Sequence, residues 1–416
     1  MQGFAAFWRT TGFPGVAILV LIGGLALFGY SFWTGRHFWP LSIDYSYLYV
    51  AGRLWGENIS PYGDALPQAA RAIVGRDLVA FAYPPNWYGL SRLLALFDPA
   101  TSNFVWFGLS TAMLIASAWL IATAMMSFRA AFTPLAKTAA PLATGSSGLV
   151  LMAVLFAGFV AATKGAGVGA YLGQTSMLAF FGQALLIYGA VKSRQAFVVV
   201  GLVILLLKPQ LGLVYAVVLL FGRRTWLSVL IASAITGVLA LPALLIGGPG
   251  DVIRQFLSGV TGYGSRVENA PDAMSGLGNF LWRVSGVEVS SFAWLGFAAI
   301  AAVIASPLLD QRLGAVNRPL AAIIAATLCA GLLIPLHDWD FLLFAPLVGF
   351  LFFLDGWALI LALAAALLLT RFIELFELLA PENTWIAHQR VSAAMATVAM
   401  LFAAASSIVV LRRRPS

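Results

Sequence analysis

Residues 192–224 read KSRQAFVVVGLVILLLKPQLGLVYAVVLLFGRR, and this stretch decides the fold class. Basic residues flank two apolar runs, and Lys208-Pro209-Gln210 lies between the two runs. A helix that spans a bilayer needs about 20 apolar residues, so two full crossings need about 40. Only about 28 residues separate the flanking charges. We therefore predict a hairpin of two short helices with Lys208 at its apex, and a break at membrane depth must be buried in protein or line a cavity.

The rest of the chain has the composition of a membrane protein. Of its 416 residues, 61% are hydrophobic and 10% are charged, whereas a soluble domain carries about 25% charged residues. Long apolar runs must be helical in lipid, because every backbone polar group has to bond within its own segment. We predict an all-α polytopic membrane protein in which residues 1–416 form one transmembrane domain of about 12 segments, with a range of about 10–13.

The predicted segments are 14–34, 101–127, 146–163, 171–191, 195–207, 209–222, 226–246, 290–308, 319–336, 341–354, 357–370 and 391–411. The first of them is too long for the apolar part of a signal peptide, and no small-x-small cleavage site follows it. We therefore predict that it is a transmembrane helix.

Basic residues between the segments predict the orientation. They are Arg129, Lys137, Lys192, Arg194, Arg223, Arg224, Arg312, Arg318 and Arg412–Arg414. With a cytoplasmic N-terminus, the predicted crossings place all of them on the cytoplasmic side, as the positive-inside rule requires. Topology thus accounts for the net charge of +8, and we expect no nucleic-acid partner. We predict an inner-membrane protein whose two termini are cytoplasmic.

Two long segments, 35–100 and 247–289, then face the periplasm. The first contains residues 47–55 and 65–73, which have the pattern of short helices at the membrane interface. Binding and catalytic groups concentrate on loops that a rigid scaffold positions. We therefore expect the active site to face the periplasm.

Asp44 is the first candidate for chemistry, because it follows the first predicted crossing. A carboxylate at the mouth of a membrane cavity could remove the proton of a hydroxyl group as a general base. The alternative is a solvated loop acid or a cap for the helix that starts near Tyr45. Tyr45 itself is a candidate for substrate binding.

Lys208 is the second candidate, because a cation between long apolar runs is costly unless it has a partner or reaches water. A lipid phosphate could be that partner, and Gln210 lies beside it. The alternative is a lysine that extends to the interface along its own apolar stem.

The stretch His337-Asp338-Trp339-Asp340 is the third candidate. Its histidine and carboxylates could bind a phosphate, assist a base or hold a metal, but residues packed this closely cannot all face one ion. We expect no metal and no cofactor, and the single Cys329 excludes a disulfide framework and a cysteine-based metal site. The alternative is a polar turn with an interfacial tryptophan.

Weaker candidates are Gln174 for binding of the donor and Tyr83, Asn86 and Arg266 for substrate binding. Tyr83 and Asn86 flank two prolines, which fix a turn. Gln174 follows a glycine, a pattern that also suits helix packing. Arg266 lies in the second long segment, where the sequence does not rank it above its polar neighbours.

Several function classes lack their motifs. The chain has no P-loop, no dinucleotide-binding glycine fingerprint and no His-Glu-x-x-His. Nucleotide-driven pumps and zinc proteases of the usual kinds are therefore excluded. A soluble nucleotide-sugar donor would need a domain that this chain does not have.

The order of the short motifs resembles glycosyltransferase family 87, the polyprenol-phosphate-mannose-dependent α-1,2-mannosyltransferases and their relatives. The resemblance covers about Asp44 to Trp339, and the motifs that carry it are Asp44-Tyr45, Tyr49, Ala51, Gly56, Pro61-Tyr62, Tyr83-Pro84-Pro85, Gly173-Gln174 and Lys208-Pro209. Each motif is short, and their order and spacing are more specific than any one of them.

The resemblance implies a GT-C fold and an inverting transfer from a lipid-phosphate sugar on the periplasmic side. It implies that Asp44 is the catalytic base and that Lys208 and His337 suit the leaving phosphate. The sequence departs from the expected pattern in two places: Asp272-Ala273-Met274-Ser275 replaces an Asn-Gln-Ser-like stretch, and His337 precedes Trp339. The donor sugar, the acceptor and the role of His337 therefore stay open.

We predict a glycosyltransferase that uses a polyprenyl-phosphate sugar and a lipid or glycan acceptor. A transporter or flippase of a lipid-linked sugar would share the cavity and Lys208, but would form no glycosidic bond. A non-catalytic scaffold for envelope assembly would tolerate the loss of Asp44 and of Lys208. A related enzyme with an arabinose or glucose donor would differ only in its substrate.

Overall fold

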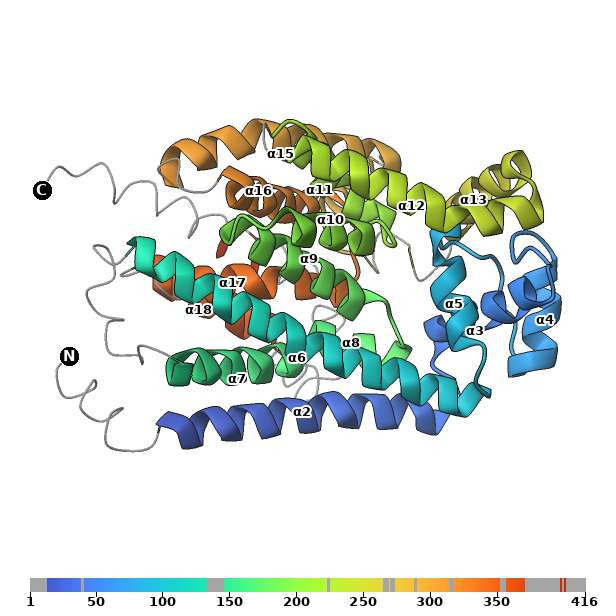
Figure 1. Cartoon of the computed structure of the whole chain (residues 1–416), viewed down its shortest axis with the longest axis horizontal. Helices are drawn as coiled ribbons and strands as arrows, with labels where there is room; N and C mark the ends of the chain where they lie inside the picture. Colours follow the sequence, from blue (N-terminus) through green and yellow to red (C-terminus); the bar gives the residue numbers. More distant parts are fainter. Residues whose placement is uncertain are drawn as a thin grey trace, which may run out of the picture.

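A computed structural model describes residues 13–38, 41–132, 146–222, 225–264, 269, 274–287, 290–313, 318–351, 357–370, 397–398 and 400–401. The described residues form helices, turns and loops, together with two isolated β-bridges, Thr163–Thr370 and Ser275–Leu336. The long helices run along the long axis of the molecule, and short helices gather at one end of it (Figure 1). This arrangement confirms that the described part of the chain is all-helical.

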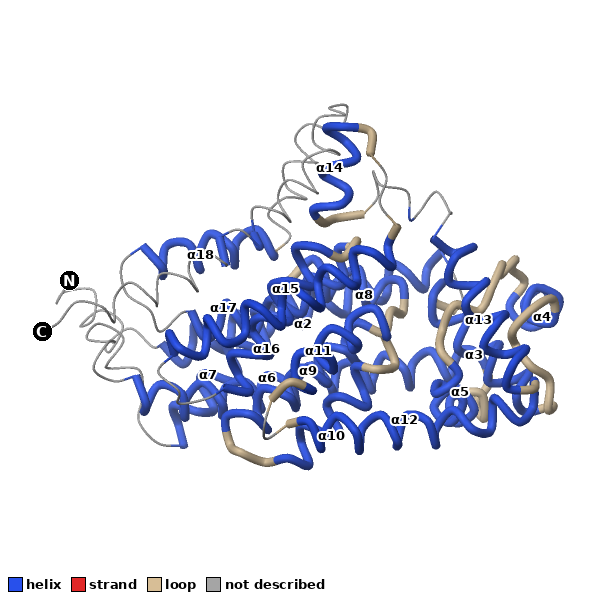
Figure 2. Tube along the Cα trace, turned by 90° about the horizontal axis from the view of Figure 1, so that it is seen from above, coloured by secondary structure: helices blue, strands red, loops and turns tan. Residues whose placement is uncertain are grey.

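The bundle consists of α2 (Phe13–Phe38), α6 (Pro99–Phe132), α7 (Ser146–Ala162), α8 (Lys164–Leu172), α9 (Ser176–Val191), α10 (Gln195–Leu205), α11 (Pro209–Leu220), α12 (Trp226–Gly247), α15 (Ser291–Leu313), α16 (Arg318–Leu333), the 3₁₀ helix η3 (Asp338–Phe344), α17 (Ala345–Leu351) and α18 (Trp357–Leu369). We use "cap" for the short helices at one end: α3 (Ile43–Gly56), α4 (Ala65–Val74), η1 (Pro85–Trp87), α5 (Tyr88–Leu94) and α13 (Pro249–Gly264). Helix α14 (Leu277–Ser285) projects from the side of the bundle (Figure 2).

Among the described residues, three helices are long and apolar enough to cross a membrane, namely Gly15–His37 of α2, Pro99–Ser127 of α6 and Trp226–Gly247. Much of their apolar surface faces outward, and Leu19 and Leu245 are 70% and 77% exposed. Exposed apolar surface on this scale marks contact with a membrane or a partner. A further set of apolar helices is only 10–17 residues long. The prediction of about 12 crossings therefore stays a prediction.

Small residues let the long helices approach one another closely. A Cβ on Gly24 of α2 would lie 2.2 Å from the Gly158 carbonyl oxygen of α7, and one on Gly201 of α10 would lie 2.6 Å from the Gly182 oxygen of α9. Contacts of this kind are typical of helices that pack in lipid, where no hydrophobic effect drives association.

The predicted short hairpin is confirmed. Helices α10 and α11 have 11 and 12 residues, and Lys208 occupies the N-cap position of α11 with Pro209 behind it. At 1.5 Å per residue each helix is about 18 Å long, well short of a bilayer core. The apex is tied to the cap, since the Trp87 indole N–H donates to the Leu207 carbonyl oxygen at 2.8 Å.

Some predicted boundaries were wrong. The helix expected from residue 47 begins at Ile43, so Asp44 lies in its first turn. The single helix expected over 171–191 is two helices, because the chain turns at Gly173 with a φ of +70° between α8 and α9. The one expected over 341–354 begins as the 3₁₀ helix η3 and continues as α17. Most of 391–411 lies outside the described residues.

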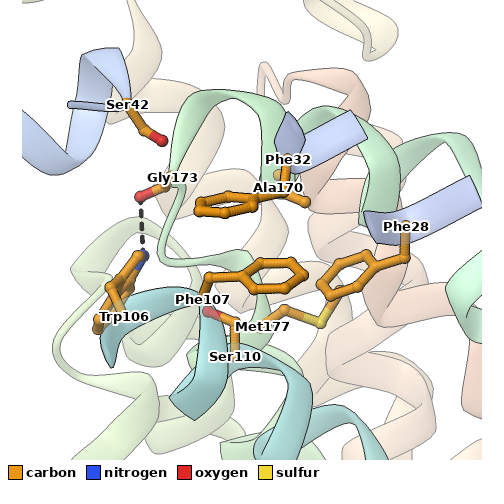
Figure 3. Close-up of a pocket in the computed structure, with 10 residues that line it drawn as sticks. Phe28, Phe32, Ser42, Trp106, Phe107, Ser110, Ala170, Gly173 and Met177 are labelled. Atoms are coloured by element: carbon orange, nitrogen blue, oxygen red, sulfur yellow. Dashed lines mark hydrogen bonds between the residues drawn. The ribbon is translucent and has the colours of Figure 1, made fainter. Parts of the chain in front are cut away.

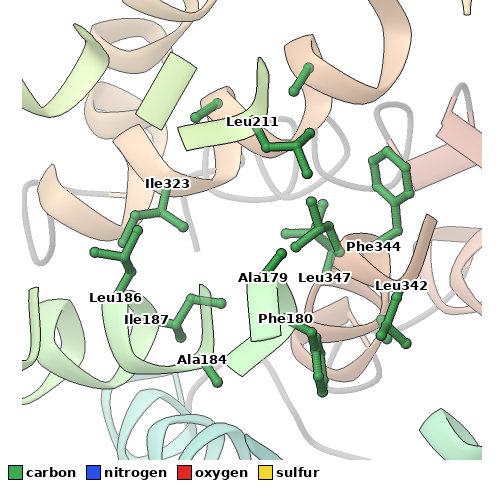
Figure 4. Packing of buried hydrophobic residues seen from close by; sticks show 14 of the residues in the cluster. Ala179, Phe180, Ala184, Leu186, Ile187, Leu211, Ile323, Leu342, Phe344 and Leu347 are labelled. Atoms are coloured by element: carbon green, nitrogen blue, oxygen red, sulfur yellow. The ribbon is translucent and has the colours of Figure 1, made fainter. Parts of the chain in front are cut away.

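The core lies where α9 meets α11, α16, η3 and α17 (Figure 4). Within this apolar region the Gln183 side-chain amide donates to the Tyr215 hydroxyl at 3.0 Å and to the Leu343 carbonyl oxygen at 2.9 Å. Tyr215 and Thr327 share a hydrogen bond of 2.7 Å. Polar links inside an apolar core fix one relative placement of the helices. They hold η3 against α9, and η3 carries Asp340.

Candidate functional site

Asp44 lies in the first turn of α3, at the junction of the cap and the bundle. Its Oδ2 accepts a hydrogen bond from the side-chain amide of Gln174, which is 7% exposed and comes from the turn between α8 and α9. The Gln174 backbone N–H donates to the Gly169 oxygen at 2.8 Å. The structure thus joins two predicted residues that are 130 positions apart.

Gly173 fixes the position of Gln174. Its φ of +70° is left-handed, and a Cβ there would lie 2.7 Å from the Cβ atoms of both Ser42 and Tyr45. The Trp106 indole N–H donates to the Gly173 carbonyl oxygen at 3.1 Å (Figure 3). Only glycine combines this backbone conformation with such close contact. The turn therefore presses directly against the start of α3.

Arg76 also fixes the start of α3, although nothing in the sequence analysis selected it. Its guanidinium donates to the Leu41 carbonyl oxygen at 2.8 Å and to the Ser46 hydroxyl at 3.4 Å. Burial lowers the pKa of Arg76, and the negative charge of Asp44 opposes that change. Arg76 is therefore within electrostatic reach of Asp44.

A narrow cavity adjoins this region between α2, α6, α8 and α9 (Figure 3). Its wall is mainly aromatic and aliphatic, and the Phe32 and Phe107 rings stack with centroids 4.0 Å apart. The lining residues are Phe28, Phe32, Ser42, Trp106, Phe107, Ser110, Gly169, Ala170, Gly173 and Met177.

Lys208 forms a buried ion pair with Asp340. The two side chains are 10% and 4% exposed, and the Lys208 ammonium donates to Asp340 Oδ1. They come from the hairpin apex and from η3, 132 positions apart. A buried lysine requires such a partner. The sequence pointed to the stretch 337–340 as a whole, but its spacing does not reveal which of its two carboxylates meets Lys208.

His337 and Asp338 have other partners. The His337 Nε2 is 2.7 Å from Asn269 Oδ1, and its ring stacks on Trp339 with centroids 4.2 Å apart. Burial lowers the pKa of His337, while the charges of Asp340, Lys208 and Asp338 act on it with mixed sign. Because an amide oxygen only accepts, Nε2 is the donor. Asp338 pairs with Lys164 at 2.9 Å.

Tyr83 connects the Asp44 and Lys208 regions. Burial raises the pKa of its phenol well above 10, and the charges of Asp44 and Asp340 raise it further. The phenol is therefore within electrostatic reach of both carboxylates. The Tyr83 ring also packs against Trp87, with centroids 5.6 Å apart, and the Trp87 indole N–H donates to the Leu207 oxygen next to Lys208.

The other predicted residues have varied surroundings. Tyr45 is fully buried, its hydroxyl is bonded to Ser102 and its ring stacks on Trp106. The Asn86 amide donates to the Leu206 oxygen at 3.4 Å at the hairpin apex. Gln210 is exposed on α11, and Arg266 lies outside the described residues. Substrate binding by these four residues stays a prediction.

The described residues contain no group of three or more histidine, cysteine or acidic side chains that could hold a metal. The expectation that the reaction needs no metal is not tested by this observation and stays an expectation.

A family model for glycosyltransferase family 87 matches residues 81–336, and the chain belongs to this family. The class of protein is therefore a glycosyltransferase with apolar, membrane-type helices, which uses a sugar donor and an acceptor. No curated protein matches the chain. The matched range contains Tyr83, Gln174 and Lys208, whereas Asp44 precedes it and Asp340 follows it. The hydrogen bond to Gln174 and the ion pair with Lys208 tie these two carboxylates to the matched region.

Proposed function

We propose that the protein transfers a sugar from a polyprenyl-phosphate donor to a hydroxyl of a lipid or glycan, with inversion at the anomeric carbon. Mannose is the first donor sugar to test. The reaction occurs at the periplasmic face of the inner membrane, in a GT-C fold whose two termini are cytoplasmic. The observation that carries the proposal is that two carboxylates are tied to the region that matches the family, Asp44 by its hydrogen bond to Gln174 and Asp340 by its buried ion pair with Lys208.

The proposed step balances with one base and one anion site. Asp44 takes the proton of the acceptor hydroxyl, whose oxygen forms the new bond to the anomeric carbon. The bond from that carbon to the phosphate oxygen breaks, and its electron pair stays on the phosphate. Lys208 stabilises the charge that the phosphate gains. No covalent sugar–enzyme intermediate is formed, and no cofactor is required.

Gln174 and Gly173 position the base in this mechanism. The amide of Gln174 holds Oδ2 of Asp44, which orients the carboxylate toward the acceptor. A base must lie within hydrogen-bond reach of the proton that it removes, so its orientation matters as much as its protonation. Arg76 supports the same turn of α3 through the Leu41 oxygen and Ser46.

A lipid-linked donor fits the surroundings better than a soluble one. Lys208 lies at the apex of an apolar hairpin, where a phosphate on a membrane lipid can reach it. The chain has none of the usual nucleotide-binding motifs.

The test is transfer of radiolabelled sugar from synthetic polyprenyl-phosphate mannose by the purified protein in native lipid extract. A labelled glycoside is the expected product. If mannose is not transferred, arabinose and glucose donors follow in the same assay. Label that crosses the bilayer of sealed vesicles without any new glycosidic bond would replace the transferase with a transporter. Neither transfer nor transport from any donor would favour a scaffold.

A further inference from the structure

Asp340 also affects how tightly the site holds the phosphate product that remains after the sugar has been transferred. We propose that Asp340 sets the charge balance of the phosphate site so that the product, a prenyl phosphate monoester, is held no more tightly than the donor, a phosphodiester. Asp340 is then a specificity-determining residue that promotes product release. This inference rests on the proposed function for the identity of its two ligands.

The ion pair at the hairpin apex is the first observation. Lys208 and Asp340 are 10% and 4% exposed, so water screens neither charge effectively. An ammonium has three N–H donors, and Asp340 takes one of them. A phosphate that binds the remaining donors approaches the lysine and the carboxylate together. The lysine attracts it and the carboxylate repels it.

The second observation is that the Asp340 charge acts well beyond Lys208. The pKa of Tyr83, which burial raises, is raised further by Asp340, and Asp340 opposes the lowering of the His337 pKa by burial. Both residues lie near the pair: the Asp340 backbone N–H donates to the His337 oxygen at 2.9 Å, and the Tyr83 ring packs against Trp87, whose indole N–H donates to the Leu207 oxygen beside Lys208. Lys208 acts on His337 with the opposite sign, so the charges of both members of the pair, and not that of the lysine alone, act on the groups around it.

The chemistry of the two ligands supplies the discrimination. The donor phosphate is a diester and carries one negative charge. Breaking its bond to the sugar leaves a monoester, which carries a charge of about −1.5 to −2 at pH 7. Repulsion by a fixed carboxylate grows in proportion to the charge of the ligand. A site with lysine alone would bind the product more tightly than the donor and would release it slowly.

The test uses two soluble probes that need no sugar transfer, a short-chain prenyl phosphate and its monomethyl ester. The methyl ester is a diester and stands in for the donor. Affinities of both probes are measured for the wild type and for Asp340→Asn in lipid nanodiscs. Asparagine keeps the shape of the side chain and its acceptor oxygen for Lys208, while it removes the charge.

The expected result has a definite ratio. Loss of one fixed charge strengthens binding of the methyl ester about threefold. Because the monoester carries about twice the charge, its binding strengthens by about the square of that factor, roughly tenfold. Asp77→Asn, which removes an exposed carboxylate on the cap, should change neither affinity. Equal gains for both probes, or no gain, would overturn the proposal.

A wild-type measurement covers the case in which Asp340→Asn does not fold. The proposal expects the wild type to bind the monoester no more tightly than the methyl ester. Tighter binding of the monoester by a factor of about ten would mean that the site acts as a simple cation, and the proposal would fail. Because neither probe carries a sugar, this outcome is independent of whether the protein transfers one.

In a transfer assay the same variant gives a second readout. Single-turnover formation of product should be at least as fast in Asp340→Asn, because the carboxylate no longer opposes the charge that the phosphate gains, whereas steady-state turnover should fall and inhibition by added prenyl phosphate should increase. A loss of the single-turnover step would instead make Asp340 part of the chemistry and contradict a role in product release.

Discussion

The Asp44 and Lys208 regions are built in different ways. Asp44 is presented by the cap, in the first turn of α3, and a glycine turn of the bundle presses Gln174 against it. Lys208 is presented by the bundle, at the apex of a broken hairpin, and its partner Asp340 is held by the core. Under the proposed function this difference matches the two substrates, with the acceptor hydroxyl approaching from the cap side and the donor phosphate arriving with a membrane lipid.

The largest expected effect concerns the cap. Asp44→Asn removes the proton acceptor but keeps the shape of the side chain, so transfer should fall by about 10³-fold. Labelled glycoside formed per minute measures this loss. The matched control is Asp64→Asn, an exposed acid on the same segment, which should keep full activity. Wild-type rates in Asp44→Asn would remove the base from the mechanism.

Lys208→Met tests the bundle region, and its effect should be the next largest. Transfer efficiency, kcat/KM for the donor, should fall by about 100-fold because the phosphate loses its cation. The change also leaves Asp340 buried without its partner, which costs about 3–5 kcal/mol of stability and should lower the Tm. Lys192→Met, at an exposed position, is the control. An unchanged KM and Tm would show that Lys208 serves neither purpose.

Gly173→Ala tests the close contact between the turn before α9 and the start of α3. A left-handed backbone costs a residue with a Cβ about 1–2 kcal/mol, and the clash with Ser42 and Tyr45 adds about 1–3 kcal/mol. Gly286→Ala carries only the first cost, because Gly286 has the same φ of +70° but nothing within 4 Å of its Cβ position, so the difference between the two variants measures the clash. Both variants should lower the Tm, and only Gly173→Ala should also lower kcat. Loss of kcat in both would point to a general effect of stability.

The smallest expected effect is the pH dependence at His337. Burial lowers its pKa below 6.5 in the folded protein. As the pH falls below 6.5 the unfolded chain takes up the proton first, so this residue reduces stability toward acid pH. His337→Gln should therefore flatten the decline of Tm between pH 7 and pH 5. An unchanged slope would contradict a neutral, buried His337.

The fold was predictable where charge and length constrain it together. The charges that flank residues 195–222 required a short hairpin, and the structure has one. The split at Gly173 was not predictable from hydropathy, because the residues on both sides are apolar and only close contact with Ser42 and Tyr45 requires the turn. Hydropathy also did not predict that the segment expected over 341–354 begins as the 3₁₀ helix η3.

The site was predictable only in part. Three residues could be selected because each is polar and lies near apolar sequence, namely Asp44, Gln174 and Lys208. Their order along the chain matches the order of the motifs that resemble the family. Arg76 could not be selected in this way. Its role depends on a hydrogen bond to the Leu41 carbonyl oxygen, which no sequence motif predicts. The sequence did not distinguish Asp340 from Asp338, because both are aspartates of the same short stretch. Only the packing of η3 against α8 and α9 decides that Asp338 pairs with Lys164 and Asp340 with Lys208.

In the proposed mechanism the cap supplies the base and the bundle binds the donor phosphate. Donor binding tests this difference most directly. Labelled polyprenyl-phosphate mannose, or whichever donor proves active, is bound to Asp44→Asn and to Lys208→Met under identical conditions. We predict that Asp44→Asn binds the donor within about threefold of the wild type, although its transfer falls by about 10³-fold, because the base acts only in the reaction. Lys208→Met should bind it at least about 30-fold more weakly. Loss of donor binding in Asp44→Asn together with normal binding in Lys208→Met would contradict the account.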